Sequence, residues 1–388
     1  MGNLANEAIT STTIRLPLEL TDKVIDCLHD NPSALRTCSL ISRAFLRRSR
    51  FHRFRSVMLN ARASEKFEKL LNESPGVGPY VRELHVSVST FERTPTWVDS
   101  RLPHIASKLP NVTTLHMRGN GEYRAAAVAD LTSVRELYLT HCEMYSMNEF
   151  VSIVGSFPHL QSVCLRDVLV GRSQALTPLA PKLKKSPKVL EFSSSRLDGP
   201  MFVDWLLAHD LWEVESLIMV PIQRIAIECV GRFLRVASHS VKYMKIAMVA
   251  LKSDTTFASE VRSNFGLSAL KNLETLEFCS PALYATQYGA DDIAFHWVIQ
   301  MLEDVSSPLK HLAFSLWTGD QSAVTGEDWE RITDLLKLPK FSSLRKITFH
   351  VWGRPGPTTI ITETIRSKLA ELDEKGILSF DNVPDPEY

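Results

Sequence analysis

The sequence predicts an α/β solenoid, in which a small helical unit precedes a series of repeats that share one parallel β-sheet. After residue 60 a short pattern, apolar-x-x-apolar-x-apolar, recurs ten times. Its last positions alternate as in a strand with one buried face. The stretches between successive copies are long enough to hold a helix each, such as 150–157, 201–208, 222–237 and 295–305. Before residue 60, apolar residues recur at helical spacing instead.

Residues 16–59 open with a helix signal. Leu16-Pro17 suits the start of a helix. In the first turn a backbone N–H has no partner within the helix, so its absence in proline costs nothing, and the φ of proline is already close to the helical value. Asn31-Pro32-Ser33 ends this helix and offers Ser33 as the N-cap of the next one. The apolar residues at helical spacing are Leu20, Val24, Ile25 and Leu28, then Leu35, Cys38, Leu40, Ile41, Ala44 and Phe45. So small a unit cannot bury all of them, which predicts a partner.

These residues resemble an F-box. The family's L-P-x-E-L opening stands at residues 16–20, and its second-helix signature S-L-V-C-R-x-W appears at 39–45 as SLISRAF. Ser42 replaces the common Cys and Phe45 the common Trp. The residue pattern of this segment is most similar to that of the F-box proteins of basidiomycete fungi. The alternative interpretation is an ordinary helical hairpin that packs on its own chain.

The F-box resemblance implies a docking surface. Its partner would be a Skp-type adaptor and, through that adaptor, a cullin of a ubiquitin ligase. The residues expected to contact the adaptor are Leu16, Pro17, Leu20, Ile25, Leu28, Leu35, Leu40, Ile41 and Phe45.

The recurring pattern has one central apolar anchor per copy. Successive anchors are separated by 22 to 36 residues. They are Leu84, Leu115, Leu137, Val163, Leu190, Leu217, Met244, Leu276, Leu312 and Ile347. The segment 376–380 (GILSF) predicts a last strand that caps the array.

This array resembles a leucine-rich repeat, whose period is usually about 20–29 residues with one strand per unit. The family prefers Asn or Cys five residues after the anchor, and here only Asn120 and Cys142 comply. The resemblance therefore implies an irregular solenoid with one parallel sheet on its concave face and longer helices on its convex side toward the C-terminus. The alternative is an ordinary α/β domain with right-handed crossovers.

Residues beside the anchors are expected to line the concave surface, because side chains of a strand alternate between its two faces. They are polar or aromatic far more often than the anchors are. A solvated surface explains most of them, and a protein target would contact the rest. The candidate target-binding residues are His85, His116, Arg118, Tyr138, Arg166, Tyr243, Lys245, Glu277, His311 and His350.

Composition excludes several classes of protein. Lys and Arg number 44 together, as do Asp and Glu, so no global field favours nucleic acid or acidic membranes. No apolar run approaches the roughly 18 residues of a membrane span, and no signal-peptide core follows Met1. The six cysteines form no C-x-x-C pair, which is typical of reduced thiols. We therefore expect a cytoplasmic or nuclear protein.

No catalytic or cofactor motif occurs. The sequence lacks G-x-S-x-G, H-E-x-x-H, the P-loop and a complete G-x-G-x-x-G, and His141-Cys142 has no second pair at metal-ligand spacing. We expect no enzyme, no cofactor and no metal, although a hydrolase with an unrecognised site is a remote third possibility.

The predicted organisation has four parts: a flexible N-terminus (1–15), the F-box-like unit (16–59), the solenoid (60–380) and an acidic tail (381–388). The function predicted for this organisation is target recognition within a Skp-cullin-F-box ubiquitin ligase. A ligase-independent scaffold for protein assembly is the alternative.

Overall fold

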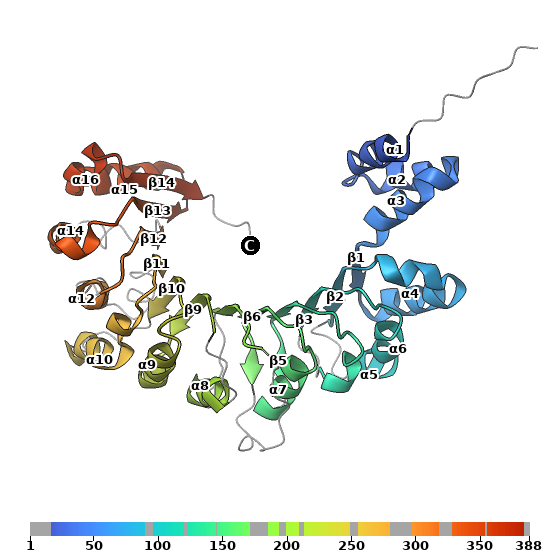
Figure 1. The fold of residues 1–388 in the computed structure, drawn as a ribbon, viewed down its shortest axis with the longest axis horizontal. Coiled ribbons are helices and arrows are strands. Elements are labelled where there is room, and N and C mark those ends of the chain that lie inside the picture. The colour runs from blue at the N-terminus through green and yellow to red at the C-terminus, as the bar shows by residue number, and fades with distance from the viewer. Residues whose placement is uncertain are drawn as a thin grey trace, which may run out of the picture.

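A computed structural model shows an arc with strands along the inside and helices along the outside (Figure 1). It describes residues 17–89, 96–119, 123–144, 146–170, 185–193, 199–208, 213–248, 255–279, 296–317, 328–353 and 355–383. Among these residues, no helix is long and apolar enough to cross a membrane.

The inside of the arc is a twelve-stranded sheet in which every paired strand is parallel. Its strands follow one another in chain order: β1 (Ser56–Leu59), β2 (Glu83–Ser87), β3 (Thr114–Arg118), β4 (Glu136–Thr140), β6 (Ser162–Arg166), β8 (Val189–Ser193), β9 (Ser216–Ile222), β10 (Tyr243–Met248), β11 (Thr275–Cys279), β12 (His311–Trp317), β13 (Lys346–Trp352) and β14 (Leu378–Val383). Sequential order means that each repeat contacts its neighbours, so the sheet is that of a solenoid. A small second sheet pairs β5 (Glu143–Met144) with β7 (Leu169–Val170).

The outside of the arc carries the connecting helices. These are α4 (Ala61–Glu73), α5 (Thr96–Ser100), α6 (Leu102–Ala106), α7 (Met147–Gly155), α8 (Gly199–Ala208), α9 (Ile227–Val236), α10 (Thr255–Phe265), α12 (His296–Asp304), α14 (Asp328–Leu336), α15 (Pro355–Lys368) and α16 (Ala370–Glu374). Short 3-10 turns precede four of the strands: η1 (Pro75–Tyr80), η2 (Ala125–Ala127), η4 (Leu267–Ala269) and η5 (Pro339–Phe341). A further one, η3 (Arg224–Ala226), leads directly into α9. Helices of nine or more residues dominate the C-terminal half, as the sequence predicted.

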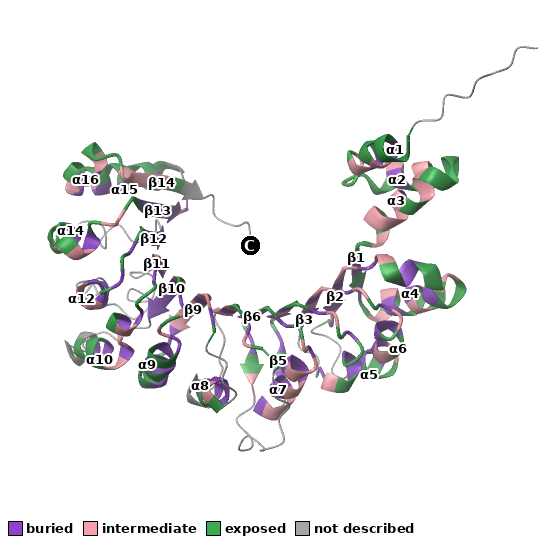
Figure 2. Cartoon of the chain, viewed as in Figure 1, coloured by how far each residue is buried: buried purple, intermediate pink, exposed green. Residues whose placement is uncertain are grey.

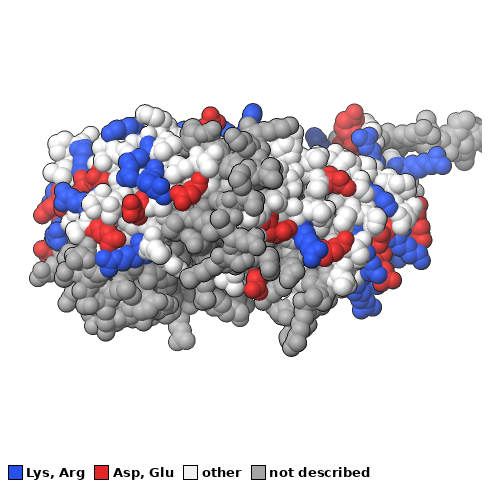
Figure 3. All heavy atoms as spheres, turned by 90° about the horizontal axis from the view of Figure 1, so that it is seen from below, with Lys and Arg blue, Asp and Glu red and all other residues white. Residues whose placement is uncertain are grey.

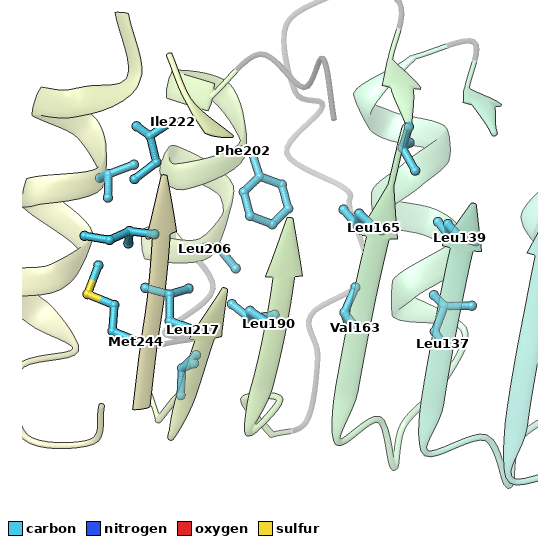
Figure 4. Close-up of a cluster of buried hydrophobic side chains, with 14 of the residues drawn as sticks. Leu137, Leu139, Val163, Leu165, Leu190, Phe202, Leu206, Leu217, Ile222 and Met244 are labelled. Atoms are coloured by element: carbon cyan, nitrogen blue, oxygen red, sulfur yellow. The ribbon is translucent and has the colours of Figure 1, made fainter. Parts of the chain in front are cut away.

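The anchors form one continuous row in register across the sheet. Leu84 pairs with Leu115, Leu115 with Leu137, and the row continues to Ile347. All ten anchors are buried. Buried segments lie on the inner strands and on the outer helices (Figure 2), and Figure 4 shows Leu137, Val163, Leu190, Leu217 and Met244 within one cluster of buried apolar side chains. The strand register predicted from the alternating pattern is therefore confirmed.

Both ends of the sheet extend the predicted row. Leu378 of β14 pairs with Ile347, which confirms the predicted closing strand. At the other end, Val57 of β1 pairs with Leu84, although the sequence placed residues 56–59 in the helical unit. The sheet thus begins at Ser56, before the predicted boundary, because Val57 and Leu59 bury their side chains on the same face as the anchors.

Aromatic rings reinforce the C-terminal half of the core. Phe278, Phe314, Phe349 and Phe380 occupy one register row on four neighbouring strands. Consecutive rings of this row stack with centroids 5.3–5.7 Å apart. Trp297 of α12 and Trp329 of α14 meet the row edge-on. Burial of rings this large contributes strongly to holding these long helices on the sheet.

The N-terminal end is a three-helix unit: α1 (Leu18–Asp26), α2 (Pro32–Ile41) and α3 (Arg43–Phe54). Pro17 stands just before α1. The predicted cap at Ser33 is wrong. Asn31 caps α2 instead, since its side chain accepts a hydrogen bond from the backbone N–H of Ala34 (3.0 Å) and Pro32 takes the first helical position.

One ionic cluster ties α1 to α3. Arg48 donates to Asp26 from Nη2 (2.8 Å to Oδ2), and His52 Nε2 lies 2.6 Å from Asp26 Oδ1. The hydrogen bond from Arg48, followed by that from His52, lowers the pKa of Asp26 to about 2. Asp26 is therefore ionised at neutral pH and fixes the angle between the two helices.

Candidate functional site

The concave face is built from the residues that follow the anchors by one position. Strand alternation points these side chains away from the helices and into the arc. They form one register row, called here the central row: Met58, His85, His116, Tyr138, Cys164, Glu191, Ile218, Lys245, Glu277, Ala313, Thr348 and Ser379. This row and the residues two positions to either side supply the candidate target-binding surface.

At the N-terminal part of the row, three rings stack face to face; this is called here the His–Tyr stack. The rings of His85 and His116 have centroids 4.2 Å apart, and those of His116 and Tyr138 lie 4.4 Å apart. Adjacent parallel strands bring them together, because the three residues pair in register on β2, β3 and β4. Burial, followed by the neighbouring His85, lowers the pKa of His116 and favours its neutral form.

A carboxylate contacts the edges of the two histidine rings. Glu83, two residues before His85 on the same face of β2, places Oε1 2.8 Å from His85 Nε2 and 3.3 Å from His116 Nε2. On the far side, Tyr138 donates a hydrogen bond to Glu136 (3.3 Å). The stack therefore presents aromatic edges flanked by two acidic groups.

In the middle of the row, Arg166 and Glu191 form a bidentate pair. Arg166 donates to Glu191 through Nε (2.7 Å) and Nη2 (3.2 Å). Although burial opposes it, this pairing lowers the pKa of Glu191. Cys164 lies beside the pair, and burial raises the pKa of its thiol to about 12. A thiol with so high a pKa is a poor nucleophile at neutral pH.

Further along, Glu277 is surrounded by donors. It accepts hydrogen bonds from Tyr243 (2.7 Å) and Ser315 (2.8 Å), and its Oε1 lies 2.7 Å from Lys245 Nζ. Only 7% of Glu277 is exposed. Glu277, a predicted target-binding residue, thus has its oxygens hydrogen-bonded within the sheet, where it holds Tyr243 and Lys245 in place.

The C-terminal part of the face holds two more predicted residues. His311 lies 2.8 Å from the hydroxyl of Thr348, and His350 Nδ1 lies 3.3 Å from Asp381. Burial lowers the pKa of His311. Arg118, at the end of β3, is exposed. The ten predicted target-binding residues thus share one face but divide into separate groups along the arc.

Glu277→Gln is expected to lower the free energy of unfolding by about 1–3 kcal/mol at pH 7, because Lys245 loses a buried charged acceptor. Burial, the largest single influence, would raise the pKa of Glu277, but the hydrogen bonds from Lys245, Tyr243 and Ser315 and the charge of Lys245 together outweigh it and lower the pKa. The stabilisation is complete above pH 4.5 and is lost as pH falls through the folded-state pKa. Urea melts at several pH values should therefore show the two proteins converging in acid.

The matched control is Glu136→Gln, because Glu136 lies on the same face of the sheet but is exposed. Its unfolding free energy should stay within about 0.5 kcal/mol of wild type. An equal loss in both variants would contradict the role assigned to Glu277.

The predicted adaptor-binding residues divide into exposed and buried sets. Leu20, Leu40 and Ile41 are exposed, as are Leu18 and Val24, which the predicted set omitted. Pro17 is exposed, Leu28 and Phe45 are half-buried, and Leu16 lies outside the described residues. The other two, Ile25 and Leu35, are fully buried within the three-helix unit.

The outside of the arc shows no field of one sign. On the side seen in Figure 3, Lys and Arg atoms are interspersed with those of Asp and Glu over the described residues. This distribution agrees with the balanced totals of the sequence. Over the part of this side that the structure describes, the mixed charges do not favour a polyanion such as nucleic acid.

No protein-family model and no curated protein matches the chain. Among solved structures, it is similar to the TLR13–ssRNA13 complex, with 12% identity and a TM-score of 0.35 over 81% of this chain and 48% of that one. The mouse RP105/MD-1 complex gives 12% identity and a TM-score of 0.30 over 81% and 44%. The yeast Rad7 and Elc1 complex gives 11% identity and a TM-score of 0.34, over 86% of this chain and 88% of that one.

The chain spans about half the length of the first two of these structures. At such identities and scores, the fold class rests on the order and register of the strands themselves. Those show one short parallel strand per repeat on the inside of an arc, with a buried anchor at the same position in each. The chain is a leucine-rich-repeat-like solenoid that begins with a three-helix unit.

Proposed function

We propose that this chain is the target-recognition subunit of a Skp-cullin-F-box ubiquitin ligase. The observation that supports it is exposed apolar surface on the three-helix unit: Leu40 is 82% and Ile41 63% exposed. Aliphatic side chains in such a position favour burial against a partner, because each contributes about 1.5–3 kcal/mol when fully removed from water. The F-box-like sequence at 16–20 and 39–45 indicates that this partner is a Skp-type adaptor.

The arc supplies the second surface of the proposed subunit. Its concave face carries the His–Tyr stack, the Arg166–Glu191 pair and the Tyr243–Lys245–Glu277 cluster. Polar and aromatic groups held on a rigid sheet suit the recognition of a protein surface. The three-helix unit lies at the N-terminal end of the arc (Figure 1), so the adaptor and the target would occupy different parts of the molecule.

Catalysis in this proposal comes from the bound partners. The chain raises the effective concentration of the target near the ligase core and contributes no reacting group of its own. A protein with this role would work in the cytoplasm or the nucleus.

The alternative from another class is a ligase-independent scaffold, in which the same concave face assembles proteins. The two functions differ in what the three-helix unit binds. We therefore expect the tagged full-length chain, isolated from its native cells, to bring down both a Skp-type adaptor and a cullin. Recovery of concave-face partners with neither ligase component would support the scaffold and contradict the proposal.

A further inference from the structure

Glu83, His85 and His116 bring three possible metal ligands to one point on the concave face. Their ligand atoms all lie within 4.8 Å of one another, and among the described residues no other group of three His, Cys, Asp or Glu side chains converges so closely. The three side chains are about one third exposed: 36% for Glu83, 29% for His85 and 30% for His116. They therefore face the interior of the arc and can be reached by an ion in solution.

The distances from Glu83 to the two histidine nitrogens are close to those between ligands of a tetrahedral ion. Zn²⁺ binds His nitrogen at about 2.0–2.1 Å and carboxylate oxygen at about 2.0–2.2 Å, which places tetrahedral ligands roughly 3.3–3.5 Å apart. Glu83 Oε1 lies 3.3 Å from His116 Nε2 and 2.8 Å from His85 Nε2. A shift of about half an ångström in one side chain would bring the closer pair to the tetrahedral separation.

We propose that Glu83, His85 and His116 form a binding site for Zn²⁺ or a similar divalent transition-metal ion. Two imidazoles and one carboxylate suit such ions, which prefer nitrogen and oxygen donors of this kind. Three protein ligands leave the fourth position open toward the interior of the arc, where water or a side chain of a bound protein can complete the coordination. The proposal does not depend on the ligase role, since it concerns the isolated chain.

Binding has a structural consequence for the His–Tyr stack. The rings of His85 and His116 are parallel to within 7°, so their Nε2 atoms cannot both point at one ion without a tilt. Metal binding should open the His85–His116 contact, while Tyr138 continues to support the outer face of His116 (ring centroids 4.4 Å apart). Without an ion, the two imidazoles are held by their mutual stacking, by Glu83 and by the Tyr138 ring.

The test uses the purified full-length chain after treatment with a chelator. Titration with Zn²⁺ in a calorimeter, and with Co²⁺ while its visible absorption is recorded, should show one equivalent bound and released again by chelator. His85→Gln and His116→Gln should each lose this equivalent. Circular dichroism and thermal melts of each variant should remain close to wild type, which would exclude loss through unfolding.

His350→Gln is the matched control. His350 also faces the arc and has a carboxylate partner, Asp381, 3.3 Å away. This variant should keep the full equivalent and the Co²⁺ spectrum. Two results would overturn the proposal: wild-type protein that binds neither ion, or binding that falls equally in His350→Gln and in the two cluster variants.

Discussion

Leu137→Ala should lower the free energy of unfolding by about 2–5 kcal/mol, because it removes a fully buried side chain and leaves a cavity in the core. Its neighbour in sequence should behave differently. Tyr138 is half-buried on the concave face, where its ring stacks on His116. Tyr138→Ala should therefore cost only the stacking contact and a little apolar area, about 1 kcal/mol. Urea denaturation of the two variants measures the contrast directly.

A second pair of neighbours tests the same register one strand away. Leu115 is buried, whereas His116 faces the arc, so Leu115→Ala should again be the more damaging change. At Leu276 and Glu277 the contrast should shrink, because Glu277 is itself buried and hydrogen-bonded. If Tyr138→Ala and Leu137→Ala proved equally destabilising, the assignment of the two faces would be wrong.

Strand register could be predicted from the sequence because it depends on a local period of two. Each anchor lies in a full apolar-x-x-apolar-x-apolar pattern, and a slip of one residue would expose all its apolar side chains. β1 was not predicted, although Phe54, Val57 and Leu59 complete the same pattern, because Phe54 is the last residue of α3 and the pattern therefore overlaps the helical unit. Because Phe54 also continues the helical spacing of α3, the sequence alone does not show where the helix ends and the first strand begins.

The partners of the concave side chains could not be predicted in the same way. Glu277 belongs to the outward set by register, but its burial depends on Tyr243 and Ser315, which are contributed by the strands on either side. The cluster of Glu83, His85 and His116 likewise has no short-range ligand spacing, because its residues come from two neighbouring strands, β2 and β3. A usable signal existed: both histidines directly follow an anchor, in ELHV and TLHM of neighbouring repeats.

Helical spacing in the three-helix unit had a similar limit. It showed which residues of α1 and α2 are apolar, but not which side the third helix covers. Both α1 and α2 pack against α3. In the assembled unit Ile25 and Leu35 are buried, while Leu40 and Ile41 near the end of α2 remain exposed. Only the assembled unit separates the residues that hold it together from those that can bind a partner.

The exposed end of α2 gives the sharpest test of adaptor binding. A Leu40→Ala, Ile41→Ala double variant should bind a purified Skp-type adaptor at least roughly 30-fold more weakly, since a buried hot spot usually contributes about 2 kcal/mol or more. Its fold should be preserved, because both side chains are largely exposed without the adaptor. Calorimetric titration with the adaptor measures the affinity, and thermal melts measure the stability.

Two control variants show what a loss of binding means. Ile360→Ala changes an exposed isoleucine on α15, far along the chain, and should leave both affinity and melting unchanged. Ile25→Ala removes a core residue of the unit, so it should lower the melting temperature of this region together with binding. A double variant that melts like wild type and still binds the adaptor at full affinity would rule out the end of α2 as the docking surface. In that case the exposed leucines and valine of α1 would have to carry the contact alone, or the three-helix unit would serve a different partner.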